Sequence, residues 1–148
     1  MKPNVGQIVG TTAIQLMTQV APALTESYAQ SSAGLLGLIL TFCAQEFDQA
    51  ADKRMRENNE MRDLLAALEP HIDESKLRTR LGGVMAGRDA SLKISELDKT
   101  NAELRKLLID VHAHLEELPT LDAKTQIRKI LALLSAHAEQ RLIKLPGA

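Results

Sequence analysis

Residues 94–118 read ISELDKTNAELRKLLIDVHAHLEEL, a charged stretch in which aliphatic residues return every three or four positions. Two seven-residue series interleave along it, and together they comprise Ile94, Leu97, Asn101, Leu104, Leu108, Val111, Leu115 and Leu118. This spacing places all members on one face of an α-helix, either in a coiled coil or on the buried side of a bundle helix, which we favour. Asn101 is the one polar member, and we expect it to fix how this face pairs with its neighbours.

Helical periodicity extends over the rest of the chain, and no segment of strand length alternates with a two-residue period. We therefore predict an all-α protein. Capping residues and prolines delimit four predicted helices, which span residues 4–22, 25–69, 73–118 and 120–145. The only kink or break that we expect lies in the third helix, at Gly82, Gly83 and Gly87.

The predicted helix lengths indicate how the helices pair. If the second and third helices fold back on each other near Pro70, all four helices lie together only over residues 4–45 and 95–145. We therefore expect a single helical domain, residues 1–148, built as an antiparallel four-helix bundle with a charged two-helix arm at residues 46–94. The arm carries more apolar residues than two isolated helices can bury, so it either folds back or packs against another chain.

Charged residues are distributed unevenly along the chain. Of the 18 basic and 19 acidic residues, only Lys2 and Glu26 precede Glu46. Residues 27–45 approach the length of a membrane crossing, but their continuous apolar run covers only residues 33–44, so we expect burial in protein and no membrane span.

The N-terminal segment and the cysteine usage indicate the compartment. Glutamines and threonines interrupt the apolar residues before residue 20, which disfavours a secretory signal. The single cysteine, Cys43, excludes an intrachain disulfide, and its apolar surroundings in the sequence predict a buried side chain. We therefore expect a reducing, cytoplasmic location.

Composition disfavours several classes of binding protein. The net charge is −1 and the pI about 6.4, so the chain lacks the basic surface that binds nucleic acid. Aromatic residues make up 2% of the chain, which leaves few side chains to stack on bases or flat cofactors. We expect no nucleic-acid partner and no cofactor.

The helix register gathers polar residues at one place in the arm. It sets Arg54 roughly opposite Asp89 and Glu57 about one turn from Arg88. The full candidate cluster comprises Arg54, Glu57, Asn58, Arg88, Asp89 and Asn101. These residues form either solvated faces with weak ion pairs or a semi-buried cluster that marks an interface or a ligand pocket.

A second group of polar residues has the spacing of metal ligands. His112 and Glu116 lie four residues apart on the predicted third helix, and His114 lies between them, so the three are candidate ligands if other helices add more. The chain contains no Glu-x-x-His pair, which carboxylate-bridged di-iron bundles require. We therefore favour an ordinary helix surface at this place.

Two classes of function fit these patterns. We favour a non-enzymatic helical-bundle protein that acts by self-association, as a homodimer, or by binding a protein partner. The alternative is a helical bundle that binds a small ligand or a metal, with a redox or acyl-chain substrate.

Overall fold

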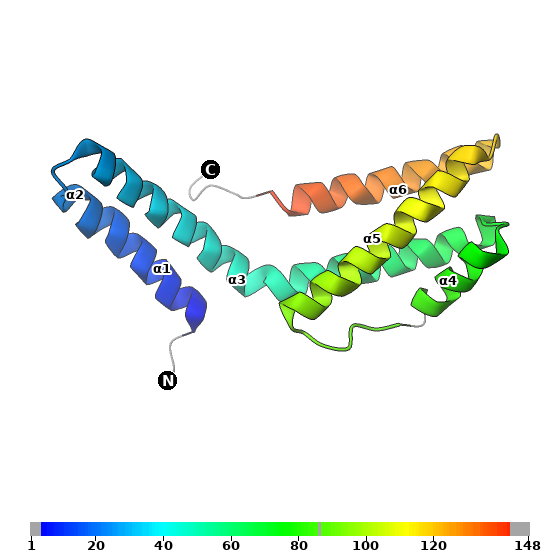
Figure 1. Cartoon of the computed structure of the whole chain (residues 1–148), viewed down its shortest axis with the longest axis horizontal. Coiled ribbons are helices and arrows are strands. Elements are labelled where there is room, and N and C mark those ends of the chain that lie inside the picture. The colour runs from blue at the N-terminus through cyan, green and yellow to red at the C-terminus, as the bar shows by residue number, and fades with distance from the viewer. Residues whose placement is uncertain (1–3, 86, 143–148) are drawn as a thin grey trace. The chain divides into compact units, whose positions relative to one another are not determined.

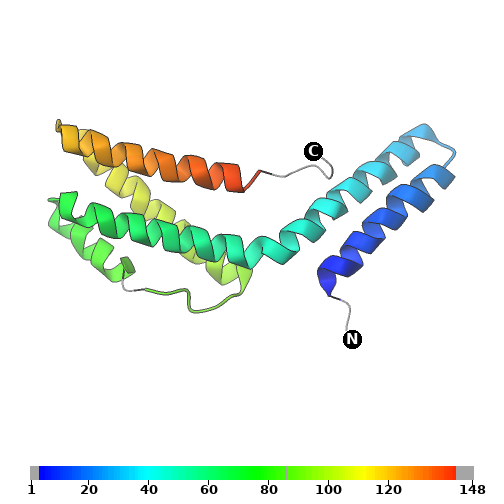
Figure 2. The same cartoon turned by 180° about the vertical axis from the view of Figure 1, so that it is seen from behind.

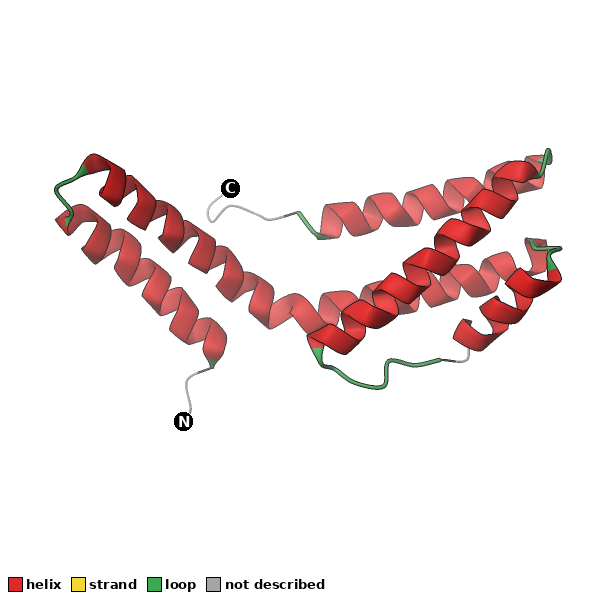
Figure 3. Cartoon of the chain, in the orientation of Figure 1, coloured by secondary structure: helices red, strands yellow, loops and turns green. Residues whose placement is uncertain are grey.

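The computed structural model describes residues 4–85 and 87–142, and every regular element in these ranges is a helix (Figures 1 and 3). The prediction of an all-α protein is therefore confirmed. The chain divides into two compact units, Met1–Ala50 and Ala51–Ala148, which we call the N-terminal and the C-terminal unit.

Two helical segments form the N-terminal unit. The first consists of α1 (Val5–Gln15), a π-helical segment (Leu16–Val20) and α2 (Ala21–Ala23). The second is the beginning of α3 (Ser27–Leu68), the longest helix of the chain. Asn4 caps α1 as the sequence predicted: its side-chain oxygen accepts a hydrogen bond from the Gln7 amide at 2.9 Å, and the Gln7 side chain accepts one from the Asn4 amide.

α1 lies beside the first part of α3 (Figure 1), and glycines on both helices lie at their contact. A Cβ atom at Gly37 of α3 would collide with the Met17 side chain and would lie 3.1 Å from the Ala13 carbonyl oxygen. The buried residues among those described in this unit are all alanine or glycine: Ala13, Ala21, Ala33, Gly37 and Ala50. The two segments therefore pack closely but enclose no core of large aliphatic side chains.

The C-terminal unit contains the rest of α3, a 3-10 turn (Glu69–His71), α4 (Ser75–Met85), α5 (Ile94–Glu117) and α6 (Leu121–Gln140). Both α4 and α6 pack against α5 (Figure 2). Every helix of this unit contributes to one hydrophobic core, whose buried members are Met61, Leu65, Leu68, Ile72, Leu77, Leu81, Leu104, Leu107, Leu108, Val111, Leu115, Ala123 and Ile130. This core gives the unit its stability.

The α5 face predicted from the seven-residue pattern is the buried face of this helix. Leu97, Asn101, Leu104, Leu108, Val111 and Leu115 are all buried there, together with Leu107. Ile94, at the first turn, is the exposed exception. The face packs within a helical bundle, as we favoured over a separate coiled coil.

The predicted third helix is two helices, because α4 ends at Met85 and α5 begins only at Ile94. The chain reverses once more at this break, so the start of α5 lies beside residues 54–58 of α3. Our register assumed one straight helix over residues 73–118 and therefore paired it with the wrong part of α3. Four helices pack together within residues 51–140. Most of the expected arm folds back and shares their core.

The last helix begins as predicted, because the Thr120 hydroxyl accepts a hydrogen bond from the Ala123 amide at 3.1 Å. It ends at Gln140, and the predicted end at Leu145, Pro146 and Gly147 lies outside the described residues.

The surface of the N-terminal unit differs from our expectation of burial. Cys43 is exposed, so the prediction of a buried thiol is wrong. One helix of the described chain, Ser27–His71, passes the length and composition test for a membrane crossing, with a mean hydropathy of 1.2 in its most apolar window. Only 11% of that window is buried. A single helix that passes this test is weak support for a membrane protein, since core helices and signal sequences pass it too.

The close contact at Gly37 leads to a first prediction. Gly37→Val should push α1 away from α3 and destabilise the N-terminal unit by about 1–3 kcal/mol, because the Ala13 backbone cannot move aside without displacing α1. Gly34→Val is the matched control on the same helix, since a Cβ at Gly34 meets no atom within 4 Å. Hydrogen exchange of the α1 amides measures the effect, and equal loss of protection in both variants would contradict this packing.

Candidate functional site: a buried polar cluster

The carboxylate of Glu57, on α3, lies at the centre of a buried polar cluster. Glu57 is only 2% exposed. Its Oε1 accepts a hydrogen bond from Arg141 Nε at 2.6 Å, and its Oε2 accepts from Asn101 Nδ2 at 3.1 Å and Arg105 Nη2 at 3.3 Å. A second Arg141 nitrogen, Nη2, also donates to Oε2. One carboxylate therefore joins α3, α5 and the residue that follows α6.

Two buried asparagines extend the cluster. Asn58 Oδ1 accepts from Asn101 Nδ2 at 2.9 Å, and Asn58 Nδ2 donates to the Leu97 carbonyl oxygen and to Asp89 Oδ1, both at 3.2 Å. Asn101 Oδ1 accepts from Arg105 Nε at 2.7 Å. Asn101 thus bonds across to α3, which is the pairing role that its place in the sequence pattern predicts.

Asp89 attaches the loop between α4 and α5 to the cluster. Its Oδ1 accepts a hydrogen bond from Arg62 Nη2 at 2.8 Å, and the two side chains are 6% and 9% exposed. Arg62 Nη1 also donates to Asn59 Oδ1 at 3.2 Å. The loop is therefore held to α3 by a buried ion pair at the point where the chain reverses.

A second contact joins α6 to α3. His137 Nε2 lies 2.8 Å from Glu60 Oε2, and the His137 ring is fully buried apart from 1% of its surface. His137 and Arg141 are one helical turn apart at the end of the chain described, and their partners Glu60 and Glu57 are one turn apart on α3. Two successive turns of the one segment therefore contact two successive turns of the other.

Two opposing effects set the pKa of Glu57. Its burial raises the pKa, but the hydrogen bonds and positive charge of Arg141, with the hydrogen bond from Asn101 and the charge of His137, outweigh this. The pKa of Glu57 therefore lies below its ordinary value, and the folded protein holds this group as a carboxylate.

The structure brings together four of the six residues of the predicted cluster. Glu57, Asn58, Asp89 and Asn101 form one hydrogen-bonded network. Arg54 instead pairs with Asp98, with 2.5 Å between Nε and Oδ1, next to the network.

The proximity that we predicted between Glu57 and Arg88 is not found among the contacts of the described residues. Arg88 is exposed in the loop, and the arginines that bind Glu57 are Arg105 and Arg141. The sequence does carry a signal for Arg105, which lies one turn after Asn101 on the same face. Nothing comparable marks Arg141, because its contact depends on how α6 folds back.

The candidate metal ligands do not converge. His112 Nε2 lies 3.7 Å from Glu116 Oε1 on its own helix, whereas His114 Nε2 lies 2.9 Å from Asp73 Oδ1. Among residues 4–85 and 87–142, no three histidine, cysteine, aspartate or glutamate side chains gather as metal ligands.

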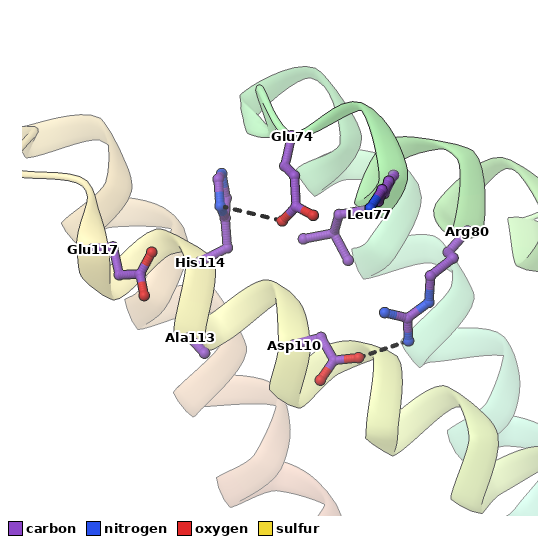
Figure 4. Close-up of a pocket in the computed structure, with 8 residues that line it drawn as sticks. Glu74, Leu77, Arg80, Asp110, Ala113, His114 and Glu117 are labelled. Carbon is purple, nitrogen blue, oxygen red and sulfur yellow. Dashed lines mark hydrogen bonds and ion pairs between the residues drawn. The ribbon is translucent and has the colours of Figure 1, made fainter.

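A pocket of about 470 Å³ lies between α4 and α5 beside His114 (Figure 4). Two pairs of its lining side chains lie close together: Arg80 Nη2 lies 2.6 Å from Asp110 Oδ2, and His114 Nδ1 lies 4.0 Å from Glu74 Oε2. No serine or cysteine lines it. The pocket therefore lacks the hydroxyl or thiol nucleophile that serine and cysteine enzymes use.

Comparisons with known proteins add nothing on function. No known family model matches the chain, and neither a curated protein nor a solved structure matches it significantly.

The cluster leads to a prediction for two adjacent loop residues. Asp89→Ala should destabilise the protein by about 3–5 kcal/mol, because it leaves the buried Arg62 charge without its carboxylate. Arg88→Ala should change stability by less than about 0.5 kcal/mol, since Arg88 is exposed. Urea unfolding measures both, and equal effects would show that the loop is not held by Asp89.

The lowered pKa of Glu57 predicts how its stabilising effect depends on pH. A carboxyl group whose pKa is lower in the folded state stabilises the fold above its unfolded value, here 4.5, and this effect disappears as the pH falls through the folded pKa. Glu57→Gln should therefore be less stable than the parent protein at pH 7, and the difference should narrow below pH 4.5. Urea unfolding at several pH values tests this, and a constant difference would contradict it.

Proposed function

We propose that the protein is non-enzymatic and acts by self-association through its N-terminal unit. The observation that carries this proposal is the apolar outer surface of that unit, whose helices carry no charge up to residue 45. Its exposed large apolar residues are Val5, Ile8, Ile14, Val20, Leu24, Tyr28, Leu35, Leu36, Ile39 and Phe47. Between Lys2 and Glu46 the only charged residue is Glu26, in the turn before α3.

This surface has the character of a protein interface. The cores of interfaces are depleted in charged residues and enriched in large apolar ones. Large apolar patches that soluble proteins expose mark interaction sites. The unit also buries only alanines and a glycine among its described residues, so burying the exposed side chains against another chain supplies stability that its own core does not.

Two such hairpins packed together would form a four-helix bundle between copies. The sequence predicted a four-helix bundle that includes residues 4–45, and self-association supplies the missing helices from a second chain. A cytoplasmic homodimer is the simplest form of this proposal. Binding of a different protein by the same surface, or of a small ligand by the pocket beside His114, is the alternative.

If the protein self-associates, the mass of the native particle exceeds the chain mass of 16.2 kDa, and a charge introduced on α3 lowers the mass of the particle. Leu35→Lys should shift the particle towards 16.2 kDa, because it places a charge in the buried interface. Leu131→Lys is the matched control: Leu131 is 52% exposed on α6, compared with 58% for Leu35. Light scattering coupled to size exclusion measures the mass. A native particle of 16.2 kDa, or equal effects of both variants, would contradict the proposal.

A further inference from the structure

The two helices of the N-terminal unit present different outer surfaces. Large apolar side chains follow α3 on the side away from α1, namely Leu35, Ile39 and the partly exposed Phe42. Leu35 and Ile39 are each two residues from Gly37, which contacts α1, and two residues correspond to about 200° around a helix. The exposed surface of the segment before α3 is mixed: beside apolar side chains such as Ile8 and Ile14 it carries amides and hydroxyls, those of Gln7, Thr11, Gln15, Thr18 and Gln19.

This difference indicates that a protein, rather than a lipid bilayer, covers the apolar face of α3. A helical hairpin surrounded by lipid must be apolar on every lipid-facing side, since amides in hydrocarbon are costly. Gln15 and Gln19 are exposed on the segment opposite the apolar face of α3. A protein that covers only the α3 face leaves these amides in water.

The charge pattern indicates a second copy of this chain as that protein. Residues 27–45 form a helical face without charge, and an uncharged partner face is its complement. The helices of the C-terminal unit carry charges every few residues. The same α3 face on another copy has the matching chemistry and the matching length, and two identical faces pair through two-fold symmetry.

We propose that two copies pair through this face of α3 with the helices antiparallel. The acidic residues Glu46 and Asp48 follow directly after the uncharged stretch. Glu46 lies on the same side of α3 as Leu35 and Ile39, whereas Asp48 lies on the α1 side. A parallel pair would bring the Glu46 carboxylates of both copies together, and such a like-charge contact is costly at an interface. An antiparallel pair centred near Gly37 separates them and sets Leu35 of one copy against Ile39 of the other. This inference rests on the proposed self-association and adds the partner and its orientation.

The single cysteine of the chain reports this orientation directly. Cys43 is exposed and lies six residues from Gly37. In an antiparallel pair the two Cys43 backbones lie about 20 Å apart, from a rise of 1.5 Å per residue and a helix spacing of about 8–10 Å. In a parallel pair in register they lie only about 10 Å apart. Pulsed electron spin resonance on the native protein, spin-labelled at Cys43, distinguishes these distances.

A cross-linking variant provides the complementary measurement. In the Cys43→Ser background, Leu36→Cys sets a thiol next to the two-fold axis of the antiparallel pair, so a short bismaleimide should link the two chains. The same reagent should leave the parent protein, with Cys43 alone, unlinked. Light scattering of both proteins before the reaction establishes that they still associate.

The outcomes of these measurements test the antiparallel pairing and the self-association separately. A long Cys43 distance together with cross-linking at position 36 is the expected result. Efficient cross-linking of the parent protein through Cys43 would overturn the antiparallel pairing while self-association stands. A particle of 16.2 kDa, or one that forms equally with Leu35→Lys, would overturn the proposed function as well. Binding of that monomer to phosphatidylcholine vesicles, lost in Leu35→Lys, would show that lipid covers this face instead.

Discussion

The buried carboxylate of Glu57 fixes the arrangement of the C-terminal unit. A charge that is 2% exposed is tolerated in a protein interior only when hydrogen bonds and opposite charges replace the lost water. Asn101 and Arg105 supply them from α5, and Arg141 supplies them from the residue after α6. Because α5 and α6 must both reach the same turn of α3, the leucine core between them has one register, and the loop ion pair of Asp89 holds the connection in place.

The N-terminal unit has no comparable constraint. The buried residues among those described there are alanines and a glycine, whereas its large side chains, such as Leu35 and Ile39, face outwards. The chain thus combines a unit with its own large core and a unit whose apolar surface exceeds its core. We propose that the C-terminal unit folds by itself and that the N-terminal unit is completed by another copy of the chain. This is why we propose a function in association rather than in chemistry.

Local patterns in the sequence predicted much of the fold, and long-range inferences succeeded less. The buried face of α5 and the caps at Asn4 and Thr120 follow from spacing and side-chain chemistry within one turn of helix, so they were predictable. The glycines near residue 85 marked a possible break, but a kink and a full reversal have the same local signature. The register beyond the break was therefore wrong. Glu57 and Asn58 were still found, because they lie on the hairpin that defined the register, and Asp89 lies in the loop at the break itself. The Arg141 contact requires the fold of α6.

The central claim is that the C-terminal unit is stable by itself and that the N-terminal unit depends on association. Hydrogen exchange of the native chain, measured residue by residue over a range of protein concentrations, tests it most directly. The account predicts that amide protection in residues 5–45 rises with concentration, while protection in residues 51–140 stays constant. Protection of residues 5–45 that is strong and independent of concentration would contradict it, because the hairpin would then be stable without a second copy.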